Sequence, residues 1–255
     1  MSSREAGDSR DRRLRYLDAM GIQAWETRVP AAETEPASVP EESDAGAVAT
    51  PSPAAVAQPP PADVAGVETL DWEALQARVQ SCTRCELHRS RTHTVFGVGD
   101  RQADWLVIGE APGRDEDLQG EPFVGRAGQL LNAMLLAVGL RREQVYIANI
   151  LKCRPPNNRD PRPEEVLACE PYLLRQIELI RPRLILAVGR IAAQNLLQTD
   201  TPIGKLRGRV HRFRDSGIPL IATYHPAYLL RSPLEKRKAW QDLQLAVKTL
   251  KEAGA

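Results

Sequence analysis

Hydrophobic positions between residues 105 and 250 follow two alternating patterns. Short, nearly continuous apolar runs occur at residues 105–108, 145–150, 184–188 and 219–223. Between and after them, apolar residues recur three or four positions apart, over residues 125–138, 163–180, 190–197 and 236–250. The first pattern predicts buried strands and the second predicts amphipathic helices. The alternation predicts an α/β fold, a three-layer αβα sandwich with a central four-stranded, mostly parallel sheet.

The N-terminal quarter of the chain has a different composition. Residues 30–61 hold 8 of the 20 prolines, mainly among Ala, Ser, Glu and Val, and contain no Leu, Ile or aromatic residue. Such a segment buries too little apolar surface to offset the entropy lost on ordering. We therefore expect a disordered linker over residues 30–68, a short helix within residues 1–29 and one globular domain over residues 69–255.

Composition and charge exclude several classes of protein. The N-terminus lacks the apolar segment of a secretory signal, and no window approaches the roughly 18 apolar residues of a membrane-spanning helix. We expect a cytoplasmic protein with no membrane partner, whose cysteines stay reduced or bind a metal. The net charge is +1, but residues 1–70 hold 12 acidic and 6 basic side chains, and the rest holds 21 acidic and 28 basic ones. The basic excess lies in the globular domain.

All four cysteines fall in the globular part. Cys82 and Cys85 form a CxxC pair, Cys153 follows the second predicted strand, and Cys169 lies in the next helical stretch. Four thiolates can hold zinc or an iron-sulfur cluster. The wide separation of the second pair favours a cluster without excluding zinc, because zinc sites usually present two short-spaced pairs. Four unrelated buried thiols are the alternative.

Polar side chains gather where the predicted strands end. Glu110 follows the first strand, Asn149 ends the second and His225 follows the fourth, while Phe123 is the one aromatic residue of the stretch after Glu110. Carboxyl ends of parallel strands meet at one edge, where ligands bind. A rigidly held carboxylate at this edge could act as a base. An aromatic face, an amide and an imidazole are the groups that would bind a flipped nucleobase. A solvated loop, a backbone-paired amide and a turn histidine are the structural alternatives.

Several long motifs carry a resemblance to a known family: GEAPGRDED, GEPFVGRAGQLL, YIANILKCRPPNNRDP and YHPAYLLR. With the four cysteines, they make residues 73–250 resemble the family 4 uracil-DNA glycosylases, the iron-sulfur branch of that superfamily. The resemblance implies an enzyme of base excision repair. It would flip uracil out of double- or single-stranded DNA and hydrolyse the N-glycosidic bond, leaving an abasic site. We expect a monomer that works at the bacterial nucleoid.

The resemblance also implies roles for single residues. Phe123 would stack on the flipped uracil, Asn149 would read its edge, and His225 would donate to O2. Gly109, Glu110 and Ala111 would line the uracil pocket. The [4Fe-4S] cluster would be held by Cys82, Cys85, Cys153 and Cys169.

The water nucleophile is not assigned by the resemblance alone. Ala111 stands where the best-known members of the superfamily have an aspartate that orients water. Glu110 is the first candidate to hold the water instead, followed by Glu116 or Asp117, with backbone carbonyls as a further option. Glu116 is also a candidate to reject thymine by filling the space beside C5 of uracil. The covalently trapping branch has a His-containing loop after its second motif; CRPPNNRDPRP has no His, so we expect turnover.

Residues near the predicted site are candidates for DNA contacts. Leu229 and Leu230 are candidate wedges and Arg231 is a candidate phosphate contact, although the same segment also fits the start of a helix. Cations flank the second strand end (Lys152, Arg154, Arg159, Arg162) and precede the fourth strand (Lys205, Arg207, Arg209, Arg212, Arg214). Such runs are usually solvated surface. On this edge of the sheet they would contact DNA phosphates, so the affinity for DNA would fall steeply as the salt concentration rises.

A second class of function fits the same residues. A non-catalytic four-cysteine metal module could bind nucleic acid, with Glu110 and His225 serving only the structure. Colour and uracil excision together would distinguish the enzyme from a colourless, zinc-containing binding module.

Residues 12–28 carry a separate signal. Leu14, Leu17, Met20, Ile22 and Trp25 are apolar among charged residues, which favours a short docking helix. The segment resembles the N-terminal peptide of the psi subunit of the bacterial clamp loader, and packing on its own domain is the alternative. Deletion of residues 1–30 should abolish retention of clamp-loader subunits in a pull-down. Undiminished retention would reject the docking.

Overall fold

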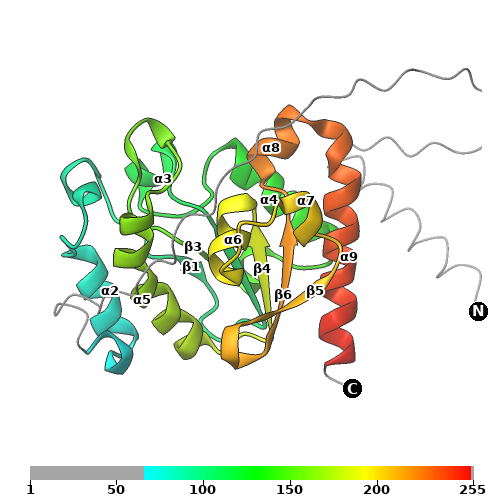
Figure 1. Ribbon diagram of the computed structural model, residues 1–255, viewed down its shortest axis with the longest axis horizontal. Helices are drawn as coiled ribbons and strands as arrows, with labels where there is room; N and C mark the ends of the chain where they lie inside the picture. The colour runs from blue at the N-terminus through cyan, green and yellow to red at the C-terminus, as the bar shows by residue number, and fades with distance from the viewer. Residues whose placement is uncertain (1–65, 254–255) are drawn as a thin grey trace, which may run out of the picture.

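The computed structural model describes residues 66–253 (Figure 1). The expected docking helix within residues 1–29 and nearly all of the expected linker over 30–68 lie outside these residues, so both stay predictions. The described chain packs from its start, because Val67 of the short helix η2 (Val67–Thr69) is buried in the core.

A sheet with the strand order β1-β3-β2-β4-β6-β5 forms the centre of the described domain. Its four inner strands are parallel: β3 (Tyr146–Asn149), β2 (Trp105–Gly109), β4 (Leu184–Val188) and β6 (Ile218–Thr223). They correspond to the four predicted strands, so the mostly parallel α/β sheet is confirmed.

Two antiparallel edge strands raise the strand count above the four that were expected. β1 (Val98–Gly99) pairs with β3, and β5 (Val210–Phe213) pairs with β6. β1 has only two residues, and β5 reads VHRF with mostly accessible side chains. Neither segment shows the apolar run of a buried strand, because an edge strand needs less apolar surface than an inner one.

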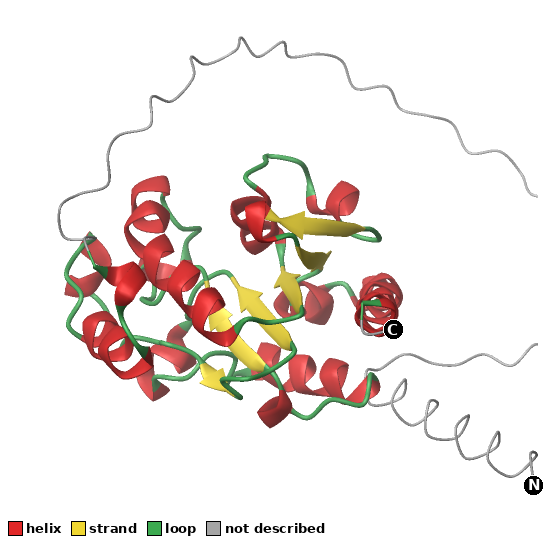
Figure 2. Ribbon diagram, turned by 90° about the horizontal axis from the view of Figure 1, so that it is seen from below, coloured by secondary structure: helices red, strands yellow, loops and turns green. Residues whose placement is uncertain are grey.

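The sheet lies between two helical layers (Figure 2). Side chains of the inner strands alternate between these layers. Leu106 and Ile108 pack with α2 (Trp72–Gln80), α5 (Pro163–Ile180) and α6 (Arg190–Leu197). Trp105 and Val107 pack with α4 (Arg126–Ala137), α8 (Pro226–Arg231) and α9 (Lys236–Glu252) on the opposite face. Both faces of the sheet are therefore covered, which explains why its strands are apolar along their whole length.

The helices expected from periodicity are α4, α5, α6 and α9. Helices that the periodicity did not predict are α2, α3 (Arg114–Gln119), α7 (Ile203–Leu206) and α8. Short 3-10 turns complete the chain: η3 (Glu86–Arg89), η4 (Arg142–Gln144), η5 (Pro156–Asn158), η6 (Arg214–Ser216) and η7 (Pro233–Glu235). None of the helices between residues 66 and 253 is both long and apolar enough to cross a lipid bilayer.

A buried carboxylate ties α9 to the carboxyl end of β6. Asp242 of α9 is fully buried and accepts hydrogen bonds from Arg207 Nε (3.0 Å) and Thr223 Oγ1 (2.9 Å). Burial raises the pKa of Asp242, and the Arg207 guanidinium opposes the rise. Thr223 is the last residue of β6, so this network fixes the strand end from which His225 extends.

Candidate active site

The carboxyl ends of the parallel strands open onto one cleft of about 800 Å³. In Figure 1 the arrows of β4 and β6 point upward, to the end of the molecule at which α8 lies. The structure brings together in its lining most of the residues that the sequence singled out: Glu110, Ala111, Glu116, Phe123, Asn149, His225 and Arg231. They come from β3 and from the segments that follow β2 and β6, as expected for ligand-binding groups of an open α/β sheet.

The Phe123 ring and the Asn149 amide form a slot in the cleft, and both approach Gly109, the last residue of β2. A Cβ atom at this position would lie 2.5 Å from Asn149 Oδ1 and 2.7 Å from Phe123 Cε2. Such distances are too short for any side chain to fit. The absence of a side chain at Gly109 therefore allows both the Phe123 ring and the Asn149 amide to lie close to the end of the strand.

Phe123 forms the aromatic wall of the slot in a strained conformation. Its φ angle is 54°, in the left-handed region that costs a non-glycine residue free energy. The side chain is 6% exposed, and its ring stacks on the His225 imidazole with centroids 5.6 Å apart. The surrounding structure must hold this bend, because an isolated chain would relax it.

Two charged side chains hold the bend. The Glu116 carboxylate accepts hydrogen bonds from the backbone N–H groups of Gly113 (3.1 Å), Val124 (3.0 Å) and Gly125 (3.2 Å). The Arg142 guanidinium donates to the carbonyl oxygens of Pro122 (2.5 Å) and Phe123 (3.3 Å). Backbone groups on both sides of Phe123 are therefore fixed by charge-assisted hydrogen bonds, the stronger class of such bonds.

Asn149 presents an unpaired acceptor to the slot. Its side chain is 2% exposed, and Oδ1 has no hydrogen-bond partner among the described residues. An unpaired buried amide oxygen costs about 1–3 kcal/mol, so such an atom calls for an explanation. A ligand that brings an N–H donor into the slot would satisfy it.

His225 is held as a neutral donor. Its Nδ1 accepts a hydrogen bond from the Ala227 backbone N–H at 3.2 Å, so the proton of the neutral ring is on Nε2. Burial lowers the pKa of His225 to about 4, and the Arg231 charge adds to the effect. Near neutral pH the imidazole therefore carries one N–H, on the nitrogen that is not bonded to the backbone of α8.

The pKa of Glu110 is shifted in the opposite direction, upward. Burial raises its pKa to about 7, repulsion from Asp160 adds to the rise, and Arg190 opposes it. Arg190 and Asp160 form an ion pair at 2.6 Å, and both line the cleft. The sequence motifs gave neither residue a role. Arg190 is the first residue after the third predicted strand and its glycine, and Asp160 stands in the motif YIANILKCRPPNNRDP.

Other predicted residues lie elsewhere. Asp117, the alternative to Glu116 for holding water, is 3% exposed and accepts a hydrogen bond from Thr92 N at 2.9 Å. It does not line the cleft, and that assignment is wrong. Glu116 lines the cleft, but both of its oxygens already accept backbone hydrogen bonds.

Two of the expected DNA contacts are also wrong. Leu229 is fully buried and packs in the core on the inner face of α8, so it cannot serve as a wedge. Lys152 is 1% exposed, and its Nζ donates to Asn149 O (3.0 Å) and Gln176 Oε1 (2.6 Å) rather than facing solvent. Both residues point inward, and a count of charges and leucines along the sequence cannot reveal this.

Three further expected DNA contacts do not stand at the cleft. Arg207 is held by the buried Asp242 and does not line the cleft. Arg212 and Arg214 lie beside the first residues of β6, at the opposite end of the sheet.

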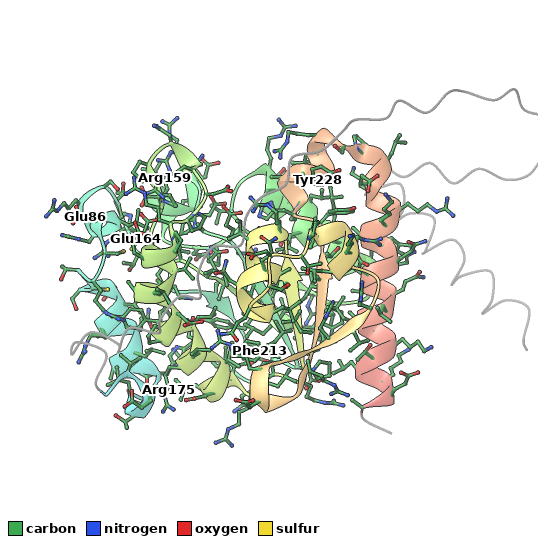
Figure 3. All side chains as sticks on the ribbon, viewed as in Figure 1. Glu86, Arg159, Glu164, Arg175, Phe213 and Tyr228 are labelled. Atoms are coloured by element: carbon green, nitrogen blue, oxygen red, sulfur yellow. The ribbon has the colours of Figure 1, made fainter. Side chains whose placement is uncertain are left out.

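Other expected DNA contacts stay near the cleft. Leu230 is 37% exposed, and Arg231 lines the cleft. Arg154 donates to Asn158 Oδ1 at 2.7 Å, and Asn158 lines the cleft. Figure 3 shows the labelled side chains of Arg159 and Tyr228 at the same upper end of the molecule, and both line the cleft.

The four cysteines surround a second, smaller cavity, with contributions from the segment after α2, the loop after β3 and α5. Hydrogen bonds reach three of the sulfur atoms: Tyr172 Oη to Cys82 (3.3 Å), Arg91 Nη1 to Cys153 (3.2 Å) and Lys152 N to Cys169 (3.2 Å). Burial raises the pKa of Cys85, Cys153 and Cys169, the last to about 12. Within residues 66–253, no three His, Cys, Asp or Glu side chains are placed to hold a metal ion.

The surroundings of the four sulfur atoms suit an anionic group. Arg84 lines the same cavity, and its buried Nε and Nη1 atoms have no hydrogen-bond partner among the described residues. Its guanidinium lies over the Tyr172 ring, 5.6 Å from the centroid. Arg91 and Lys152 add positive charge at the same cavity. Four soft sulfur ligands beside the positive charges of Arg84, Arg91 and Lys152 fit a thiolate-ligated metal cluster.

Comparison with known proteins defines the class of protein. The family model of the uracil DNA glycosylase superfamily matches residues 96–244, a range that includes every residue of the slot. The chain belongs to this superfamily.

Within it, the chain belongs to the type-4 uracil-DNA glycosylases. It is 52% identical over 184 residues to the type-4 uracil-DNA glycosylase of Archaeoglobus fulgidus, which covers 70% of this chain and 92% of that protein. It is 44% identical over 185 residues to the type-4 enzyme of Thermotoga maritima (71% and 96% covered). The identity to that of Pyrobaculum aerophilum is 42% over 182 residues (69% and 93% covered). The family resemblance of the motifs is thus confirmed.

Proposed function

We propose that the protein removes uracil from DNA by hydrolysing the N-glycosidic bond, leaving an abasic site for base excision repair. The observation that carries the proposal is the buried, unpaired Asn149 Oδ1 beside the Phe123 ring in a cleft of about 800 Å³. Uracil has an N–H donor at N3 that would satisfy this oxygen. The names of the type-4 relatives support the same reaction. A non-catalytic binding module would leave the unpaired Asn149 amide oxygen unexplained.

In uracil recognition, the slot would bind one flipped pyrimidine. The Phe123 ring offers a stacking face, Asn149 Oδ1 accepts from N3–H, and Asn149 Nδ2 donates to O4. Cytosine would present an unprotonated N3 and an amino group instead. The acceptor Asn149 Oδ1 would then face another acceptor, and the donor Nδ2 would face another donor. Glu116 supports recognition by holding the Phe123 bend; rejection of thymine by Glu116 is a further proposal.

Bond cleavage would use His225 and Glu110. As the bond breaks, negative charge grows on O2 of the leaving uracil and positive charge grows on the sugar. The neutral His225 Nε2–H would donate to O2, and one preorganised donor of this kind contributes about 3 kcal/mol. An ionised Glu110 would orient the attacking water and stabilise the sugar cation. The neutral imidazole and the half-ionised carboxyl coexist near pH 7 because burial shifts their pKa values in opposite directions.

DNA would bind at the end of the molecule where the cleft opens, at the carboxyl ends of the parallel strands. Arg231 at the cleft and Arg154 beside it are proposed phosphate contacts, and Leu230 is a proposed apolar contact. We place the protein in the cytoplasm, at the nucleoid, because that is where such a substrate is found. The monomeric state stays a prediction.

Loss of the His225 donor should slow cleavage. His225→Ala should lower the single-turnover rate of uracil excision from an oligonucleotide by roughly 10²-fold or more, whereas Asn149→Ala should weaken uracil recognition. His211→Ala is the matched control. His211 lies on the edge strand β5, forms a hydrogen bond with the carbonyl oxygen of Leu206 and does not line the cleft. Unchanged rates in both pocket variants would reject the assignment of the pocket.

The pH dependence should report Glu110. Its ionised form increases as the pH rises through about 7, so kcat/KM should rise between about pH 6 and pH 8 with an apparent pKa near 7. His225, with its pKa lowered to about 4, stays neutral over this range and adds no step. Glu110→Gln should flatten the profile as well as lower it. An unchanged rise in the variant would show that another group titrates.

We further propose that the four cysteines hold a [4Fe-4S] cluster, with zinc as the less favoured alternative. The observations in support are the four thiols around one cavity and the unpaired nitrogens of Arg84 beside them. When bound, the cluster would act as a structural cross-link between the segment after α2, the loop after β3 and α5. Cys153 lies four residues after Asn149, so this cross-link would steady the end of the strand that carries the uracil-reading amide.

Elemental analysis and colour should identify the metal. The purified protein should be brown, with a broad visible absorption band and about four iron atoms per chain. Cys153→Ser should lose the colour and lower the midpoint of thermal unfolding. Colourless protein containing one zinc would instead support the mononuclear site.

A further inference from the structure

A buried lysine lies between the cavity of the four cysteines and the slot. Lys152 is 1% exposed, and its side chain is among the largest that are fully buried in the described residues. A lysine is rarely buried to this extent unless an anion pairs with it. In the described part of the chain, however, its ammonium donates only to Asn149 O (3.0 Å) and Gln176 Oε1 (2.6 Å), and both groups are neutral. A buried positive charge without a counter-ion is costly, so Lys152 calls for a source of negative charge.

The cavity of the four cysteines can supply this negative charge. Lys152 lines the cavity, directly precedes Cys153 and donates its backbone N–H to Cys169 Sγ at 3.2 Å. Four thiolates around a doubly charged metal core leave a net negative site, whether the core is zinc or iron-sulfur. Arg84 and Arg91 line the same cavity. Of these three cations, only Lys152 forms a hydrogen bond with a described residue of the slot.

The same ammonium holds the strand end that carries the amide of the slot. Asn149 is the last residue of β3, and its carbonyl oxygen accepts from Lys152 Nζ. The chain between them runs beside the end of β2, because Ile150 N donates to Gly109 O at 3.0 Å. The Lys152 side chain thus folds back on the backbone three residues before it. A carbonyl group held in this way restricts the ψ angle of Asn149, and with it the place of the Asn149 amide.

Helix α5 holds Lys152 at both of its ends. Cys169 and Gln176 lie seven residues apart on this helix, two turns along the same face. Cys169 Sγ accepts from the Lys152 backbone, and Gln176 Oε1 accepts from Lys152 Nζ. Gln176 Nε2 in turn donates to Phe96 O at 2.9 Å, so the Gln176 amide is fixed as well. The position of the ammonium is therefore determined by the same helix that carries one of the four thiols.

We infer that Lys152 is a positioning residue that joins the cysteine site to the slot. Its ammonium balances the negative charge of the metal-loaded cysteine site and, through the Asn149 carbonyl, keeps the uracil-reading amide in place. Partners of this kind, one shell away from the metal ligands, commonly tune both metal affinity and activity. The positioning part of the inference rests on the proposed function, whereas the link between Lys152 and the metal can be tested without DNA.

Retention of the metal should depend on the charge of Lys152. Lys152→Met removes the charge and both hydrogen bonds of Nζ, but it keeps an unbranched side chain of similar length. A lysine that served only packing could be replaced in this way at little cost to stability. As a counter-ion it cannot, so purified Lys152→Met should release its metal to a chelator about tenfold faster than wild type or more. Elemental analysis at successive times gives this rate.

The chain offers a matched control for the substitution. Lys248 is exposed on α9 and lines neither the cleft nor the cavity of the four cysteines. Lys248→Met should therefore release its metal at the wild-type rate and excise uracil at the wild-type rate.

A double-mutant cycle separates positioning from a general effect on the fold. At equal metal content, Lys152→Met should lower single-turnover excision of uracil by about tenfold or more. In the Asn149→Ala background the same substitution should change the rate by less than about twofold, because no amide is left to position. Damage to the fold alone would lower the rate by the same factor in both backgrounds.

Hydrogen exchange on the wild-type chain decides the matter if Lys152→Met does not fold. Removal of the metal should leave the ammonium without its counter-ion and loosen the end of β3. The amide of Ile150 should then exchange faster, while amides at the end of β6 keep their protection. Equal protection of Ile150 with and without metal would reject the link.

The outcomes distinguish this inference from the proposed function. A wild-type protein without metal, or Lys152→Met that retains its metal as well as wild type, would reject the counter-ion role. Faster release of metal with equal rate factors in both Asn149 backgrounds would reject the positioning role. If the wild-type protein excises no uracil, the proposed function fails and the positioning role with it, while the chelator experiment still decides whether Lys152 supports the metal.

Discussion

The bend at Phe123 is the constraint on which the site depends. A stacking ring opposite Asn149 requires a backbone with φ of 54°, which alone would be unfavourable. The Glu116 carboxylate and the Arg142 guanidinium compensate by binding backbone groups on both sides of it. Gly128 completes the arrangement, because a Cβ atom there would lie 1.8 Å from Phe123 O. The charges of this loop thus hold the backbone in place, and Glu116 supports the proposed recognition of uracil only through that backbone.

Burial sets the protonation states of His225 and Glu110 in the cleft. The same removal from water that lowers the pKa of His225 to about 4 raises that of Glu110 to about 7. A donor that stays neutral and a carboxyl that is half ionised are what the two ends of a breaking N-glycosidic bond require near neutral pH. The Asp160–Arg190 pair at the mouth of the cleft adjusts only the second group, since Asp160 raises the pKa of Glu110 and Arg190 lowers it.

The sequence predicted the parts of the molecule that depend on uniform burial. The four inner strands and the long helices α4, α5, α6 and α9 were found because each buries a continuous or periodic apolar surface. The edge strand β5 and the short helices α3 and α8 were missed because a few residues give no clear period. Residues at strand ends identified the slot, because topology brings such ends together. Orientation was not predictable: Lys152 and Leu229 lie in the right motifs but point inward, and Asp160, in the same motif as Lys152, lines the cleft.

Helix α8 shows why orientation decides function here. Its six residues follow His225, whose Nδ1 accepts the N–H of Ala227 and so fixes the donor proton on Nε2. Leu229 anchors the inner face of the helix against α4 and α9 in the core, which leaves Tyr228 and Leu230 outward. Because the inner face of this helix is fixed in the core, the backbone that holds the ring of His225 at its N-terminal end is fixed as well. The position of the proposed donor thus depends on a leucine that itself never reaches the cleft.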